Sequence, residues 1–191
     1  MEADFYTENE LNELGLKSFG KNVLISKKCS IYGAENMTIG NNVRIDDFCI
    51  LSGCISIGNY VHIAAYSALY GRYGIEIQDF CGISARGTLY SAIDDFSGDY
   101  MVSPMIPSEF TKLTTGKIVL KKYTQIGCNS VVFPKVVVNE GAVTGALTLI
   151  KKDVPSWTIV AGIPARVLKK RKKNLLEMAE NLKSYDKEIV K

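Results

Sequence analysis

The sequence lacks any apolar run that approaches the roughly 18 residues needed to cross a bilayer as a helix. Its first ten residues also lack the basic start and apolar stretch that form an export signal. We therefore expect a cytoplasmic protein without a membrane partner. The 191 residues are 47% hydrophobic and 23% charged, a mixture typical of one folded domain with a continuous core.

The cysteines form no Cys-x-x-Cys pair, and their number, five, is odd. Free thiols in a reducing compartment are expected. The net charge of +3 is too small to indicate nucleic-acid binding, although residues 169–173 are all basic. We interpret this run as a solvated helix face, with attraction of a phosphorylated ligand as the alternative. No metal site is expected.

Aliphatic residues recur every six positions, a period that fits neither a helix nor a simple alternating strand. The first series is Ile39, Ile45, Leu51, Ile57, Ile63 and Leu69, and the register resumes at Ile77, Ile83 and Leu89 and again at Leu120, Ile126, Val132, Val138, Thr144 and Ile150. Only Thr144 breaks the chemical rule. Four positions after most of these aliphatic residues stands a second small or medium side chain, Cys49 and Cys81 among them, so packing explains these cysteines better than nucleophilic catalysis.

One short strand per hexad and three hexads per turn would build a triangular prism, in which successive coils pair and stack their aliphatic residues. The segments between the strands, such as 40–42 and 58–60, contain Gly and Asn, which tolerate left-handed backbone angles at corners. The sequence thus predicts an all-β parallel β-helix over residues 23–89 and 118–160.

Three segments depart from the repeat. Residues 90–117 contain Asp94-Asp95, Gly98, Pro104 and Pro107, the composition of a loop that leaves the prism and returns. Thr7 and Glu10 form a capping-box pattern, which predicts a helical cap within residues 1–20. After Pro164 the apolar spacing predicts an amphipathic helix over 164–186. All of these segments belong to a single domain, 1–191.

The repeat and the segment 151–166, which contains Trp157 and ends in Gly162-Ile163-Pro164-Ala165-Arg166, resemble the hexapeptide-repeat acyltransferases and their closing signature. The resemblance covers nearly the whole chain. It implies a left-handed coil, a homotrimer, and active sites in the clefts between neighbouring prisms. It also implies acetyl-CoA as co-substrate, with contacts carried over to Cys128, Ala146, Lys151, Lys152, Arg166 and Lys169. Cys128 and Ala146 are one turn apart, so both would offer backbone groups to the pantetheine arm, and the four cations would meet phosphates.

A narrower resemblance appears in residues 22–53, 61–71 and 91–100, which are similar to N-acyltransferases that act on dTDP-4-amino-4,6-dideoxyglucose. This likeness implies N-acetylation of a nucleotide-linked amino sugar that is destined for a surface polysaccharide such as an O-antigen. A different amino sugar, for example a 3-amino or galacto-configured one, remains an alternative.

The likeness to this subfamily assigns Asp94 as the group that holds the sugar amine and Ser84 as its hydroxyl partner. The thioester would be attacked directly, because a neutral amine carries a usable lone pair. Asp94 and Asp95 have a simpler interpretation as an Asx turn, and Ser84 as a corner residue. His62, the only histidine, lies one coil above Arg44 and is either a surface residue or a contact to substrate.

Three other classes of protein share part of this pattern. A γ-type carbonic anhydrase shares the fold but needs three histidines shared across a trimer interface, a pattern that one histidine per chain cannot satisfy. A scaffold or ice-binding β-helix would leave the long loop and the basic closing segment without a role. A sugar O-acetyltransferase with His62 as general base is the serious alternative, and replacement of His62 would then abolish activity.

Overall fold

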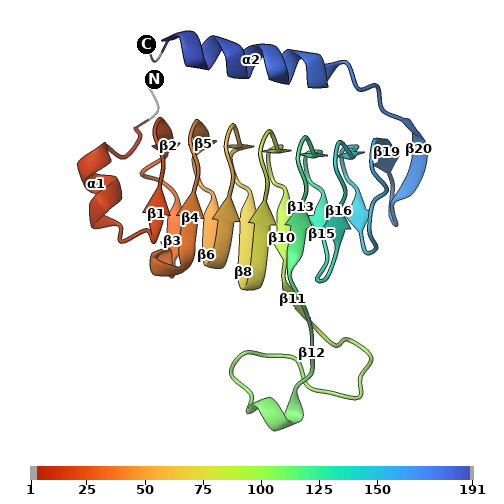
Figure 1. The fold of residues 1–191 in the computed structure, drawn as a ribbon. Coiled ribbons are helices and arrows are strands. Elements are labelled where there is room, and N and C mark those ends of the chain that lie inside the picture. Colours follow the sequence, from red (N-terminus) through yellow and green to blue (C-terminus); the bar gives the residue numbers. More distant parts are fainter. Residues whose placement is uncertain (1–3, 190–191) are drawn as a thin grey trace.

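The computed structural model describes residues 4–189 and confirms the parallel β-helix (Figure 1). Face one contains β1 (Ser18–Phe19), β4 (Met37–Ile39), the second halves of β6 (Ile50–Ile57) and β8 (Ala68–Ile77), β13 (Ile118–Leu120) and β16 (Val137–Val138). Face two contains β2 (Val23–Ile25), β5 (Val43–Ile45), β7 (His62–Ile63), β9 (Gly82–Ile83), β14 (Gln125–Ile126), β17 (Val143–Thr144) and β19 (Thr158–Ala161). Face three contains β3 (Ser30–Tyr32), the first halves of β6 and β8, β10 (Thr88–Tyr90), β15 (Val131–Val132) and β18 (Leu149–Ile150).

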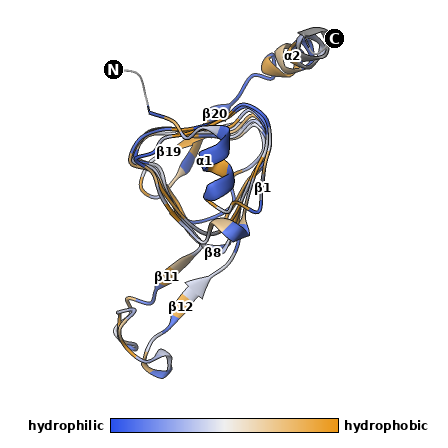
Figure 2. Cartoon of the chain, turned by 90° about the vertical axis from the view of Figure 1, so that its left-hand side faces the viewer, coloured by the Kyte–Doolittle hydropathy of each residue, from blue (hydrophilic) through white to orange (hydrophobic). Residues whose placement is uncertain are grey.

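The chain passes three corners in each turn, which we name for the faces they join. Corner A joins faces one and two, corner B joins faces two and three, and corner C joins faces three and one. Viewed along its axis, the coil is a rounded triangle (Figure 2). Corner C therefore lies opposite face two.

The core is the stack of inward aliphatic residues that the repeat predicted. Ile45, Ile63 and Ile83 pair in successive coils of face two and are at most 1% exposed. Thr144, the chemical exception, is also buried. Its hydroxyl oxygen accepts the N–H of Gly127 at 2.9 Å, so the buried polar atom is satisfied.

The sequence suggested that Gly and Asn provide the left-handed backbone angles at the corners, and the structure differs from this in part. At corner A the left-handed residues include Asn42 and the bulky Tyr60, with φ of 56° at each. Gly40 and Gly58 are required for another reason: a Cβ on Gly40 would stand 2.7 Å from the carbonyl carbon and oxygen of Gly58 in the next coil. Glycine permits the close stacking of the coils here.

The predicted loop over 90–117 leaves the prism at corner C as an antiparallel ribbon (Figures 1 and 2). Its stem is formed by β11 (Ala92–Asp94) and β12 (Leu113–Thr115), and its far part contains the short helix η2 (Ser108–Phe110). A second short helix, η1 (Ala34–Asn36), accommodates the extra residues between Ile31 and Ile39. Buried Ser91 anchors the ribbon because its hydroxyl donates to the carbonyl of Tyr70 and accepts from the N–H of Tyr73.

The N-terminal prediction is confirmed: Thr7 caps α1 (Glu8–Glu13) in a capping box with Glu10. The C-terminal boundary, 164–186, was wrong. Strand β20 (Arg166–Lys170) pairs antiparallel with β19, and α2 begins only at Leu175 and ends at Ile189. The last strand of face two would otherwise leave an open edge, and pairing with β20 closes it. The basic run therefore lies in a strand and a linker, not on a helix face.

Among residues 4–189, no helix is long and apolar enough to span a bilayer.

Candidate active site

Corner B brings together several of the predicted site residues. Ser84 follows β9 directly, and Cys128 and Ala146 occupy the same corner in the next two coils. Backbone hydrogen bonds link these coils, because the N–H of Asn129 donates to the carbonyl of Ala85 and that of Leu147 donates to the carbonyl of Cys128. Ala85, Cys128 and Ala146 thus occupy equivalent positions in three successive coils, and Ser84 immediately precedes the first of them.

A cavity of about 400 Å³ on face two joins His62 to Ser84. Its lining consists of Tyr60, His62, Ala64, Phe80, Cys81, Gly82, Ile83, Ser84, Ala85 and Gln125. The two polar side chains meet here because β7 and β9 pair with His62 opposite Gly82. Asp94 and Cys128 are not part of this lining.

His62 is held by a carboxylate that the sequence analysis did not single out. Nε2 of His62 lies 2.7 Å from Oδ2 of Asp46, and Nε of Arg44 donates to Oδ1 of Asp46 at 2.7 Å. Burial acts to raise the pKa of Asp46, but the hydrogen bonds from Arg44 and His62 outweigh it and lower the pKa below its usual value. Asp46 is therefore a fixed negative charge that orients the imidazole.

Asp94 lies at the end of β11, opposite Leu113 on β12. Within residues 4–189 its carboxylate has neither a hydrogen-bond nor an ion-pair partner. Its neighbour Asp95 makes the Asx turn instead, because Oδ1 of Asp95 accepts the N–H of Ser97 at 2.8 Å. Oδ2 of Asp95 also lies 3.8 Å from Nζ of Lys112. The simpler interpretation thus applies to Asp95 and leaves Asp94 available for a ligand.

Asp94 and Ser84 are not close within one chain. The ribbon that carries Asp94 leaves at corner C, which is opposite face two, whereas Ser84 lies at corner B beside the face-two cavity. Figure 2 shows the ribbon pointing away from the triangle. A site that uses both residues needs two chains.

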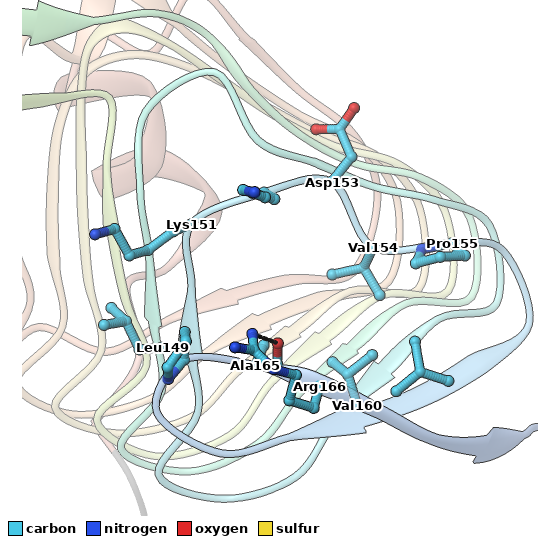
Figure 3. A pocket seen from close by; sticks show the side chains of 11 residues that line it. Leu149, Lys151, Asp153, Val154, Pro155, Val160, Ala165 and Arg166 are labelled. Atoms are coloured by element: carbon cyan, nitrogen blue, oxygen red, sulfur yellow. Dashed lines mark hydrogen bonds between the residues drawn. The ribbon is translucent and has the colours of Figure 1, made fainter.

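Three of the predicted cofactor residues, Lys151, Lys152 and Arg166, line a second cavity of about 310 Å³ at the C-terminal end of the prism (Figure 3). Leu149, Val154, Val160 and Ala165 form part of its apolar wall. Nζ of Lys151 lies 5.6 Å from the ring centre of Phe133. Lys169 is in β20 opposite Ile159 and does not line this cavity, and neither do Cys128 and Ala146.

The cations nevertheless fit a phosphorylated co-substrate. Arg166 and Lys169 lie on β20, which extends face two beyond the coils of Cys128 and Ala146. Four strand steps separate β9 from β20, or about 19 Å at the usual spacing. Neutral backbone near Ser84 and exposed cations at the far end match a ligand that carries a thioester at one end and phosphates at the other.

Comparison with known proteins agrees with this geometry. Residues 36–71 match the family model described as bacterial transferase hexapeptide (six repeats). The chain is 46% identical over 177 residues, 91% of this chain and 92% of the relative, to the dTDP-4-amino-4,6-dideoxy-D-glucose acyltransferase of Escherichia coli.

Solved structures give the same result. AntD, an N-acyltransferase from Bacillus cereus in complex with dTDP and 3-hydroxybutyryl-CoA, superposes with a TM-score of 0.95 at 51% identity, covering 97% of this chain and all of that one. A maltose O-acetyltransferase from Clostridium difficile 630, at 19% identity and a TM-score of 0.53 over 87% and 75% of the two chains, shares the fold alone. The chain belongs to the hexapeptide-repeat acyltransferases, whose coil is left-handed. More narrowly, it is an acyl-CoA-dependent sugar N-acyltransferase.

Proposed function

We propose that this protein transfers an acetyl group from acetyl-CoA to the 4-amino group of dTDP-4-amino-4,6-dideoxyglucose. The observation that carries the proposal is the nearly full-length similarity to the Escherichia coli acyltransferase of that name. Structures of AntD with dTDP-4-amino-4,6-dideoxyglucose and coenzyme A support the same pair of ligands. The protein acts in the cytoplasm, and the acylated sugar is destined for a surface polysaccharide.

Coenzyme A lies along corner B. Backbone groups near Cys128 and Ala146 contact the pantetheine arm, which places the thioester near Ser84. Lys151, Lys152, Arg166 and Lys169 bind the phosphates as charge-assisted donors.

The protein acts as a homotrimer in which the ribbon of one subunit reaches the cleft of its neighbour. The support for this is the placement of Asp94 at corner C and of Ser84 at corner B. A cyclic arrangement of three prisms makes three equivalent interfaces and so three equivalent sites. Asp94 of one subunit then faces Ser84 of the next.

The reaction needs no acyl-enzyme. The neutral sugar amine attacks the thioester carbonyl, the new C–N bond forms, and the C–S bond breaks as the tetrahedral intermediate collapses. Coenzyme A leaves as a thiolate and takes up the proton that the amine releases. Asp94 accepts a hydrogen bond from the amine and holds its lone pair toward the carbonyl, and the Ser84 hydroxyl assists as a hydrogen-bond partner.

We propose O-acetylation of a sugar hydroxyl as a second candidate activity on the strength of one observation: His62 is oriented by Asp46 inside the cavity that contains Ser84. An oriented imidazole is the usual base for a sugar hydroxyl. The deciding experiment mixes the protein with acetyl-CoA and either the dTDP-4-amino sugar or a panel of sugars that carry only hydroxyl groups, and follows release of free thiol. Release with the amino sugar alone supports the proposal, and release with the hydroxyl sugars alone contradicts it.

A further inference from the structure

Corner B carries a row of stacked side chains in the coil of Ser84 and the three coils before it, which we call the cation–aromatic ladder: Lys28, Phe48, Tyr66 and Arg86. The rings of Phe48 and Tyr66 stack with centroids 5.0 Å apart. Nζ of Lys28 lies 5.4 Å from the centre of Phe48, and Cζ of Arg86 lies 5.5 Å from the centre of Tyr66. A flat apolar pair is therefore flanked by a cation at each end.

The shared backbone conformation explains why these side chains stack, but it does not require them to be aromatic or cationic. Phe48, Tyr66 and Arg86 occupy equivalent left-handed corner positions, with φ of 60° to 61°. The next two coils place Asn129 and Leu147 at the same position. The corner thus changes from aromatic and cationic to neutral just past Ser84, in the direction of Cys128 and Ala146.

A second aromatic row at corner A shows what a purely structural ladder looks like here. Tyr60, Phe80 and Tyr123 stack there with centroids 4.9 and 5.2 Å apart, and all three rings are partly buried. Helix α2 covers part of this row, because Phe80 and Tyr123 line a groove with residues of α2. By contrast, Phe48 is 47% and Tyr66 54% exposed.

The charges along the ladder are not equivalent. Lys28 is neutralised locally, because its Nζ lies 2.7 Å from Oδ2 of Asp47. The guanidinium of Arg86 is exposed and faces only the ring of Tyr66, with no carboxylate partner in the described part of the chain. A guanidinium held in place by a ring is preorganised to bind a diphosphate with two parallel hydrogen bonds.

We propose that the cation–aromatic ladder binds the nucleoside diphosphate of the acceptor substrate, with Arg86 on the diphosphate and the exposed flank of the Phe48–Tyr66 pair against the base. This inference rests on the proposed function. Arg86 is two residues from Ser84, so the sugar, which is joined directly to the diphosphate, reaches the reaction centre. Coenzyme A also contains a nucleoside diphosphate, but its proposed contacts lie on the opposite side of Ser84.

The test measures binding of dTDP and of coenzyme A separately by calorimetry, with the wild-type protein and with R86A, R86K and Y66A. We expect R86A to weaken dTDP binding about tenfold or more and to reduce its dependence on salt, because one charge-assisted contact to a phosphate is lost. R86K retains the charge but not the planar fork, so we expect a smaller loss. The affinity for coenzyme A stays within about twofold in every variant.

Arg72 provides a matched control, because its Cζ lies 5.7 Å from the ring of Tyr73 in a similar exposed pair outside corner B. R72A should bind dTDP like the wild type. If the wild type binds dTDP and R86A and Y66A bind it equally well, the ladder is not the nucleotide site and this inference alone fails. A loss of coenzyme A affinity in R86A, with dTDP affinity unchanged, would also overturn it. If the wild type binds no dTDP, the proposed function fails as well.

Discussion

The separation of Asp94 from Ser84 leads to a prediction about mixed trimers. In the proposed assembly each site takes Ser84 from one subunit and Asp94 from its neighbour, because corners B and C of one prism face different neighbours. Each single variant, S84A or D94A, removes one hydrogen bond to the reacting amine in all three sites. We expect kcat/KM for the dTDP-4-amino sugar to fall about 10- to 100-fold in each.

When the two variants are produced together in equal amounts, random assortment leaves a site intact when one side contributes Ser84 and the other Asp94. Every trimer that contains both variants has one such site among its three, so the activity of the purified mixed trimers should return to about a third of the wild-type value. The assay uses two different affinity tags, purification of particles that carry both, and thiol release per site. Two differently tagged copies of S84A, assembled in the same way, should show no recovery. If the activity of the mixed trimers stays at the level of the single variants, a shared site is refuted.

Three further predictions concern single residues. Replacement of His62 by Asn should change N-acylation by about twofold or less, since the amine needs no external base, whereas a loss of 100-fold or more would show that the amine does use His62 as its base. Leu69 is 0% exposed in the core. Its replacement by Ala should lower the free energy of unfolding by about 2–5 kcal/mol in a denaturant titration, and a decrease below about 1 kcal/mol would contradict the stacked core. G40A should destabilise the coil by about 1–3 kcal/mol in the same titration, because the new Cβ meets the backbone of Gly58 at 2.7 Å; unchanged stability would contradict this close stacking.

The sequence alone predicts the β-helix because the six-residue repeat is visible within short stretches of the chain. On each face a coil contributes only a few strand residues, and the inward residue of one hexad contacts the same position of the next coil, so a single repeat predicts every layer of the core. Ile45, Ile63 and Ile83 illustrate this, since each is nearly fully buried. Even the exception at Thr144 obeys a local rule, because the N–H of Gly127 in the preceding coil donates to its hydroxyl.

The features that the sequence missed depend on contacts between distant segments. Val167 and Leu168 belong to the apolar pattern that predicted a helix over 164–186, but they lie in β20, which pairs with the otherwise open edge of β19. Asp46 and His62 are 16 residues apart, and their contact becomes visible only when the length of the coil is known. Similarly, two adjacent aspartates look alike in the sequence. Only the backbone of the ribbon decides that Asp95 makes the turn and that Asp94 does not.

Two carboxylates that link neighbouring coils give the fold a predictable response to acid. At corner A, Oδ1 of Asp79 accepts the backbone N–H of Asn59 at 2.9 Å and its side-chain amide at 3.0 Å, and Nζ of Lys122 lies 3.2 Å from Oδ2. Burial acts to raise the pKa of Asp79, but these donors outweigh it and lower the pKa, as Arg44 and His62 do for Asp46. A lowered folded-state pKa means that the contribution to stability is present above the unfolded pKa, near 3.8, and is lost as the pH falls through the folded value.

We therefore expect the melting temperature to be nearly constant from about pH 7 to 5 and to fall steeply below about pH 4, where these carboxylates take up protons. D79N keeps the shape and the oxygen that accepts from Asn59 but cannot titrate. Its melting temperature should be lower than that of the wild type at pH 7, because the pairing with Lys122 is lost, and the difference should shrink at pH 3. A difference that stays constant across this range would show that Asp79 stabilises the corner by packing alone, since only a titrating charge makes the benefit depend on pH.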